Sequence, residues 1–302
     1  MENNIIPQSE KTKDKEEVVE DLYKLETKPA VEDGFYKLRV VEFEQEESTF
    51  ENFELIKITH PEDTEVGVIN NRIVTYKDLI EPKEITGVEI EEDIIKRDKG
   101  ESIKIKFEEN LLDGHDLMVS KTSLRAGDRR LDEVEDIFKD ADKGAELDFL
   151  HLIILATFLA TPIAMTQSWS VKYSIYFYEY KANGKEKEVG VVHPRERMSE
   201  QLIELPAEEM DSLELSLKWT ETHKIKPLGL ARKTEDFTRK EVIECEKMTE
   251  LKKDRVGEDI NGSLKLTPGE GATLYFPASD KKKKKGEKTT YLLKSKGFYN
   301  AI

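Results

Sequence analysis

Short runs in which apolar and polar residues alternate dominate the sequence on both sides of its middle. Residues 102–107 and 213–219 are the clearest examples, because every second side chain in each run is apolar. Strict alternation is typical of β-strands that turn one face to a core and the other to water. Further strands are predicted at 35–43, 53–59, 66–76, 117–119, 170–180, 189–192, 273–276 and 291–293.

Two-residue turn signals interrupt some of these runs. Asn183-Gly184 and Asn70-Asn71 each stand between two β-rich stretches. Asn and Gly adopt positive φ at low cost, which the tight turns of β-hairpins require. The sequence therefore predicts a β-hairpin at Asn183-Gly184 and a turn at Asn70-Asn71.

Other segments have the spacing of helices. In 129–142 the apolar side chains form one stripe, and Asp128 can cap its start. Pro162 ends the helix that follows, so that 128–168 is predicted to form a helical hairpin with a buried apolar helix. The predicted helices cover 16–25, 129–142, 146–161 and a charged segment, 235–253.

The order of elements sets the expected fold class. Strands do not alternate with helices as βαβ units require, which disfavours a doubly wound parallel sheet. We expect an α+β fold, mostly antiparallel β, with a central helical hairpin and one further charged helix. The expected parts are a flexible charged tail (1–30), a β-rich domain or half (31–127), the hairpin (128–168) and a second β-rich domain or half (169–302).

The apolar run 149–165 has two interpretations. It is 17 residues long, and a membrane-spanning helix needs about 20. His151 and Pro162 shorten its clean apolar part, and no cluster of Lys or Arg abuts either end. These details favour a helix buried in a protein core over a single membrane span.

Composition and charge indicate which binding partners and which cellular compartment to expect. The formal net charge is −16 and 37% of the residues are charged, which disfavours binding to nucleic acid or to anionic lipid. Cys245 is the single cysteine, so no internal disulfide is possible, and we expect it half-buried in the charged helix. No secretory signal is visible, and a cytoplasmic location is expected. The lysine run 281–285 is expected to be a solvated loop.

Two short segments carry candidate catalytic residues. Asp113, His115 and Asp116 lie on one turn and could supply a general base, although Asp-Gly turns also form for conformational reasons alone. His193 and Arg195 follow a strand, where a solvated loop is the favoured alternative to an anion site. The remaining isolated histidines, His60 and His223, are expected at the surface.

One segment has a partial cation-binding pattern. Asp140, Asp142 and Asp148 stand at positions 1, 3 and 9 of an EF-hand-like loop. Ala145 replaces the glycine of position 6, and His151 replaces the glutamate of position 12. An ordinary helical hairpin is therefore the favoured interpretation, and no cofactor is expected.

These features lead to a functional hypothesis. No phosphate-binding, zinc-protease, hydrolase or kinase motif occurs in the sequence. We expect a non-catalytic structural, scaffolding or binding component of a protein assembly, with other protein subunits as partners, including a second copy of the chain. The alternatives are an enzyme with a dispersed active site and a single-pass protein anchored through 149–165.

Overall fold

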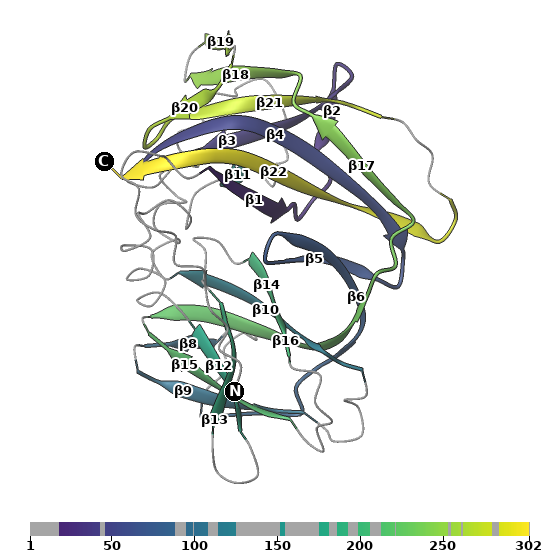
Figure 1. Ribbon diagram of the computed structural model, residues 1–302, viewed down its shortest axis with the longest axis vertical. Helices are drawn as coiled ribbons and strands as arrows, with labels where there is room; N and C mark the ends of the chain where they lie inside the picture. Colours follow the sequence, from purple (N-terminus) through teal and green to yellow (C-terminus); the bar gives the residue numbers. More distant parts are fainter. Residues whose placement is uncertain are drawn as a thin grey trace.

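The computed structural model describes residues 18–42, 46–87, 95–98, 100–107, 114–124, 152–154, 175–180, 186–192, 199–205, 213–220, 222–252, 255–260, 262–279 and 284–301. Within these ranges the chain forms twenty-two strands in four sheets and no helix. The sheets are stacked along the long axis of the molecule, as Figure 1 shows. The fold is therefore mostly antiparallel β, as predicted.

Two sheets form the upper part of the molecule in Figure 1. Sheet A has the order β1 (Val19–Lys24), β22 (Glu287–Ala301), β4 (Glu46–Pro61) and β17 (Arg239–Glu244), with β20 (Leu264–Leu266) also beside β4. Sheet B has the order β11 (Leu152–Ile154), β3 (Phe35–Val41), β21 (Gly271–Pro277), β18 (Lys247–Lys252) and β19 (Arg255–Ile260), with β2 (Ala30–Glu32) also beside β3. We call this pair of sheets the upper sandwich.

Two further sheets form the lower part. Sheet C has the order β14 (Ser199–Glu204), β10 (Leu117–Leu124), β16 (His223–Thr234), β6 (Arg72–Ile80) and β5 (Glu65–Ile69), with β8 (Ile95–Arg97) also beside β16. Sheet D has the order β13 (Glu186–Val192), β12 (Ile175–Tyr180), β15 (Glu214–Trp219), β9 (Ser102–Lys106) and β7 (Glu84–Thr86). We call this pair the lower sandwich.

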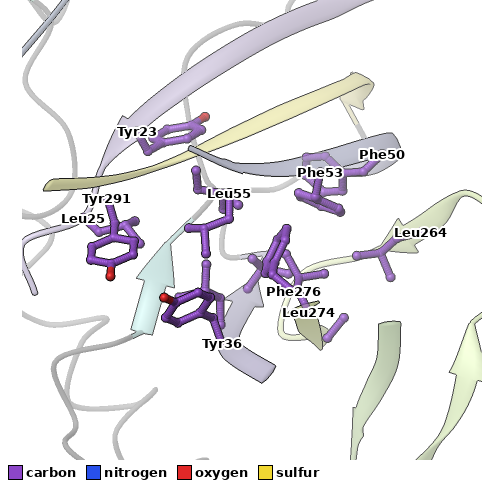
Figure 2. Close-up of a cluster of buried hydrophobic side chains, with 14 of the residues drawn as sticks. Tyr23, Leu25, Tyr36, Phe50, Phe53, Leu55, Leu264, Leu274, Phe276 and Tyr291 are labelled. Atoms are coloured by element: carbon purple, nitrogen blue, oxygen red, sulfur yellow. The ribbon is translucent and has the colours of Figure 1, made fainter. Parts of the chain in front are cut away.

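Each sandwich has its own hydrophobic core. In the upper one, aromatic rings from both sheets meet, as Figure 2 shows for Phe53, Phe276 and their neighbours. The Phe50 ring lies 5.0 Å from that of Phe53 and 5.7 Å from that of Tyr299, centroid to centroid. The lower core contains the alternating residues Ile103, Ile105, Phe107, Leu213, Leu215, Leu217 and Trp219. The predicted alternation at 102–107 and 213–219 is thereby confirmed.

The two sandwiches pack against each other through sheets A and C. Leu22, Ile56 and Leu292 on sheet A cluster with Val66 on sheet C. β1–β4, β11 and β17–β22 belong to the upper sandwich, and β5–β10 and β12–β16 belong to the lower one (Figure 1). Strands from 31–127 and from 169–302 share all four sheets, so the two β-rich segments fold together.

Several predicted local structures are confirmed. The expected turn at Asn70-Asn71 joins β5 and β6 into an antiparallel hairpin, and the two residues have φ of 47° and 58°. β12 and β13 pair antiparallel as predicted, while Asn183-Gly184 between them lies outside the described residues.

The predicted helix over 235–253 is wrong. This segment contains two strands, β17 and β18, with Cys245 at the corner where the chain leaves sheet A for sheet B. β17 pairs with β4, and β18 pairs with β21 and β19. Charged residues fit here because alternate side chains of β17 are exposed, and a strand accepts such residues at a sheet edge.

The predicted short helix over 16–25 is also wrong, since β1 occupies Val19–Lys24 within the segment expected to be a charged tail. Leu22 and Tyr23 are both buried although they are adjacent. Leu22 faces the lower sandwich and Tyr23 enters the upper core, because both faces of this strand are covered. Burial on both sides removes the alternation that would have indicated a strand.

The predicted helical hairpin is wrong at three residues. Leu152–Ile154 form β11, which pairs parallel with Arg39–Val41 of β3. The rest of 128–168, including most of the apolar run 149–165, lies outside the described residues. In the part of the chain that the structure describes, no helix is long and apolar enough to cross a membrane.

Candidate functional site

Residues 114–116, the described part of the candidate segment, precede β10 in sheet C. Gly114 has φ of 74°, which supports the turn interpretation. The backbone N–H of Lys233 donates to Oδ1 of Asp116 at 2.9 Å, and that of Leu205 donates to the Asp116 carbonyl at 2.8 Å. Asp116 thus joins β10 to the two strands beside it, β16 and β14.

His115 is bonded to the main chain. Its Nε2 lies 2.9 Å from the carbonyl oxygen of Asp78, which can only accept, so Nε2 carries the hydrogen. Nδ1 is buried and has no hydrogen-bond partner among the described residues. The structure therefore brings His115 and Asp116 close to Asp78 on β6. The side chains of His115 and Asp116 each form a hydrogen bond with the main chain of a neighbouring strand, β6 and β16 respectively.

An exposed network of charges surrounds this turn. Arg232 lies 3.7 Å from Asp78, and Glu204 accepts from Lys233 and lies 3.8 Å from Arg72. The hydrogen bond from Lys233 holds the pKa of Glu204 below its usual value, and the charges of Lys233 and Arg72 add to this effect. Exposed ion pairs of this kind contribute at most about 1 kcal/mol each to stability.

The other predicted site residues cannot be placed in this arrangement. Asp113, His193, Arg195, Asp140, Asp142 and Asp148 lie outside the described residues, and their roles stay predictions. Within the described ranges, no group of three or more His, Cys, Asp or Glu side chains could hold a metal ion.

A polar cluster that the sequence did not indicate joins the two sandwiches. Nζ of Lys24 on β1 lies 2.9 and 2.8 Å from the two carboxylate oxygens of Glu200 on β14. The Tyr76 hydroxyl on β6 donates to the same carboxylate at 3.0 Å. Burial raises the pKa of Tyr76 far above its usual range, and the Glu200 charge adds to this, so the hydroxyl keeps its proton.

His60 lies near the end of β4, and the prediction that it is a surface residue is wrong. It is fully buried, with Nδ1 2.9 Å from the Thr64 hydroxyl and Nε2 2.9 Å from the Thr290 hydroxyl. Burial lowers its pKa, and the nearby charge of Lys288 adds to this. The surface prediction also fails for His223, which begins β16 and is buried.

Cys245 is half-buried as expected, but at the corner between β17 and β18. Its thiol lies 3.2 Å from the carbonyl oxygen of Lys247, which accepts. Burial raises the pKa of the thiol to about 11. A thiol with such a pKa is a poor nucleophile at neutral pH.

β17 is an outer strand of sheet A, and we call it the β17 edge (residues 239–244). The Cys245 N–H donates to the Phe53 carbonyl at 3.0 Å, which fixes how β17 pairs with β4. In an antiparallel ladder, alternate residues direct both backbone groups to one neighbour. Arg239, Glu241 and Ile243 therefore bond to β4. The backbone groups of Lys240, Val242 and Glu244 point away from β4, on a side where no described strand pairs.

The side chains of the β17 edge are exposed at the same positions. Lys240, Val242 and Glu244 are solvent-exposed, and Val242 is 48% exposed. The unpaired backbone of an edge strand can receive an extended segment of another chain. This edge could not be recognised from a pattern that predicts a helix over 235–253.

Comparison of the chain with protein-family models, curated proteins and solved structures found no match.

Proposed function

We propose that the protein is a non-catalytic binding or structural component of a protein assembly, and that it makes contact through the β17 edge. The observation that carries this proposal is the unpaired backbone of β17 with Val242 exposed at its centre. An edge strand offers a ready-made row of donors and acceptors to an extended segment of another protein.

The polar clusters favour this role over a dispersed active site. Glu200 is held by Lys24 and Tyr76, and both ring nitrogens of His60 are held by threonine hydroxyls. Asp116 accepts from a backbone N–H. Each of these groups links strands of the fold, and a catalytic acid or base needs reach to a substrate.

The two joined sandwiches suit a scaffold. Lys24, Glu200 and Tyr76 lie where sheets A and C meet, next to the apolar cluster around Leu22 and Ile56. Together these contacts resist movement of one sandwich against the other. A rigid body presents its edges with a low entropic cost of binding.

The test is isolation of the tagged chain from its own cells under native conditions, followed by mass measurement and cross-linking. We expect a species larger than the 34.9 kDa chain, with cross-links from Lys240. Val242→Asp is expected to weaken the association because it places a charge in the contact. The matched control is Val31→Asp on β2, where the exposed fraction is 47%.

Two results would contradict the proposal. One is a monomer in native extract with no cross-linked partner. The other is an assembly that survives Val242→Asp but is lost in the Val31→Asp control. Loss of a ligand or a reaction in His115→Ala or Asp116→Ala, with the assembly intact, would support the enzyme alternative.

A further inference from the structure

The β17 edge has a charge pattern that is complementary to itself. Its outward-pointing residues are Lys240, Val242 and Glu244, in that order along the chain. A second β17 strand running antiparallel, with Val242 opposite Val242, places Lys240 of each copy opposite Glu244 of the other. Opposite charges directly across an antiparallel pair are stabilising, and like charges are destabilising.

The backbone pattern fits the same register. Directly opposed residues in an antiparallel pair either exchange both hydrogen bonds or exchange none. Val242 and its two even-numbered neighbours all point their N–H and C=O groups outward. Pairing Val242 with Val242 therefore makes all three outward positions hydrogen-bonded pairs.

Other alignments of the two β17 strands place less favourable pairs of residues opposite each other. Centring the pair on Lys240 or on Glu244 places two like charges opposite each other, and centring it on Glu241 places Lys240 opposite Val242. In the favoured register Glu241 lies opposite Ile243, whose side chain packs against the upper core. No two like charges then stand directly opposite on either face.

We infer that two copies of this chain associate through their β17 strands, antiparallel and centred on Val242, so that sheet A continues across a twofold axis. This rests on the proposed function and names a second copy of the chain as the partner. The contact closes after two copies because each uses its only β17 edge. The charges also hinder addition of unrelated strands, which lack the matching pattern.

The experiment is a charge swap in the full chain, followed by sedimentation at a series of concentrations. The wild type is expected to show twice the 34.9 kDa chain mass. Lys240→Glu and Glu244→Lys are each expected to weaken the dimer at least about tenfold, because each places like charges opposite at two sites. The double variant restores both opposite pairs and is expected to dimerise again. Lys285→Glu, with the same charge change on an exposed loop residue, is the control.

A backbone variant tests the register. Val242→Pro removes an N–H that points away from β4, so the sandwich keeps its ladder while the dimer is lost. Ile243→Pro removes an N–H that bonds to β4 and is expected to destabilise the fold as well. Circular dichroism separates the two effects.

A monomeric wild type, or a double variant that stays as weak as the single ones, overturns the inference. If the wild type is monomeric and yet Val242→Asp releases a different protein from the native assembly, self-pairing fails while the proposed function stands. If no assembly of any kind forms, both fail.

Discussion

Lys24 and Glu200 are 176 residues apart in the chain, yet the ammonium group of Lys24 contacts both carboxylate oxygens of Glu200. Lys24 belongs to the upper sandwich and Glu200 to the lower one. Their side chains are 23% and 14% exposed, so water screens the pair only in part. This ion pair, with Tyr76 beside it, links the two sandwiches next to the apolar cluster around Leu22 and Ile56.

Removing this pair is expected to destabilise the whole molecule. Glu200→Ala leaves the Lys24 charge and the buried Tyr76 hydroxyl without their acceptor, which should lower the free energy of unfolding by about 1–3 kcal/mol. Urea unfolding of Lys24→Ala, Glu200→Ala and the double variant measures the coupling. Lys104→Ala, in the more exposed pair with Glu214, should cost less than about 1 kcal/mol. Additive effects of Lys24→Ala and Glu200→Ala would contradict the expected coupling.

Acid is expected to weaken the fold through His60. Its pKa in the folded protein is lowered from 6.5 by burial, so below about pH 6.5 the unfolded chain binds more protons. Stability is therefore full above pH 6.5 and is lost as the pH falls from 6.5 through the folded pKa. Chemical unfolding at pH 7.5 and pH 5 should show this loss.

His60→Gln should reduce that loss while keeping a polar side chain near Thr64 and Thr290. The carboxyl group of Glu204 titrates below its ordinary value of 4.5, so its effect falls in a separate, more acidic range. An equal loss between pH 7.5 and pH 5 in wild type and His60→Gln would rule out His60 as the cause.

Cys245 is expected to react slowly with thiol reagents. With the pKa raised to about 11, its thiolate fraction at pH 8 should be about 100-fold below that of an ordinary cysteine. Reaction with a disulfide reagent in native buffer, compared with the same reaction in concentrated urea, measures the difference. The single cysteine makes the signal unambiguous, and equal rates in the two conditions would show that Cys245 is not shielded.

Gly229 is expected to tolerate no side chain. It has φ of 149° at a register shift between β16 and β10, and a Cβ there would overlap the carbonyl oxygen of Ile80. Gly229→Ala should cost more than about 2 kcal/mol. Gly286→Ala, at φ of 84° with open space around it, should cost about 1 kcal/mol from backbone strain alone. Thermal unfolding compares the two, and equal costs would exclude the predicted overlap.

Whether a strand could be predicted from the sequence depended on how many of its faces are buried. β9 and β15 were predicted because each turns one face to the lower core. Apolar and polar residues therefore alternate along both strands. β1 was mistaken for a helix because Leu22 and Tyr23 are buried on opposite faces. The charged strand β17 was mistaken for part of a helix because it lies at the edge of sheet A, where charged side chains are accepted.

Candidate site residues were predictable only where they are close in the chain. The turn containing His115 and Asp116 could be found because its residues are adjacent. The cluster of Lys24, Tyr76 and Glu200 leaves no local pattern, since each residue alone is an ordinary member of its strand. The β17 edge became visible once the partner of the segment, β4, was known.

By itself, the sequence determined three features of the fold. They are the richness in antiparallel strands, the turn at Asn70-Asn71, and the buried faces of 102–107 and 213–219. These features depend on neighbouring residues, and local sterics and the period of the strand decide them. The tertiary structure alone decided the pairing of β17 with β4, the contact of Lys24 with Glu200 and the open backbone around Val242. Such features join residues that are distant in the chain, and the free energy of packing selects them only when the whole molecule folds.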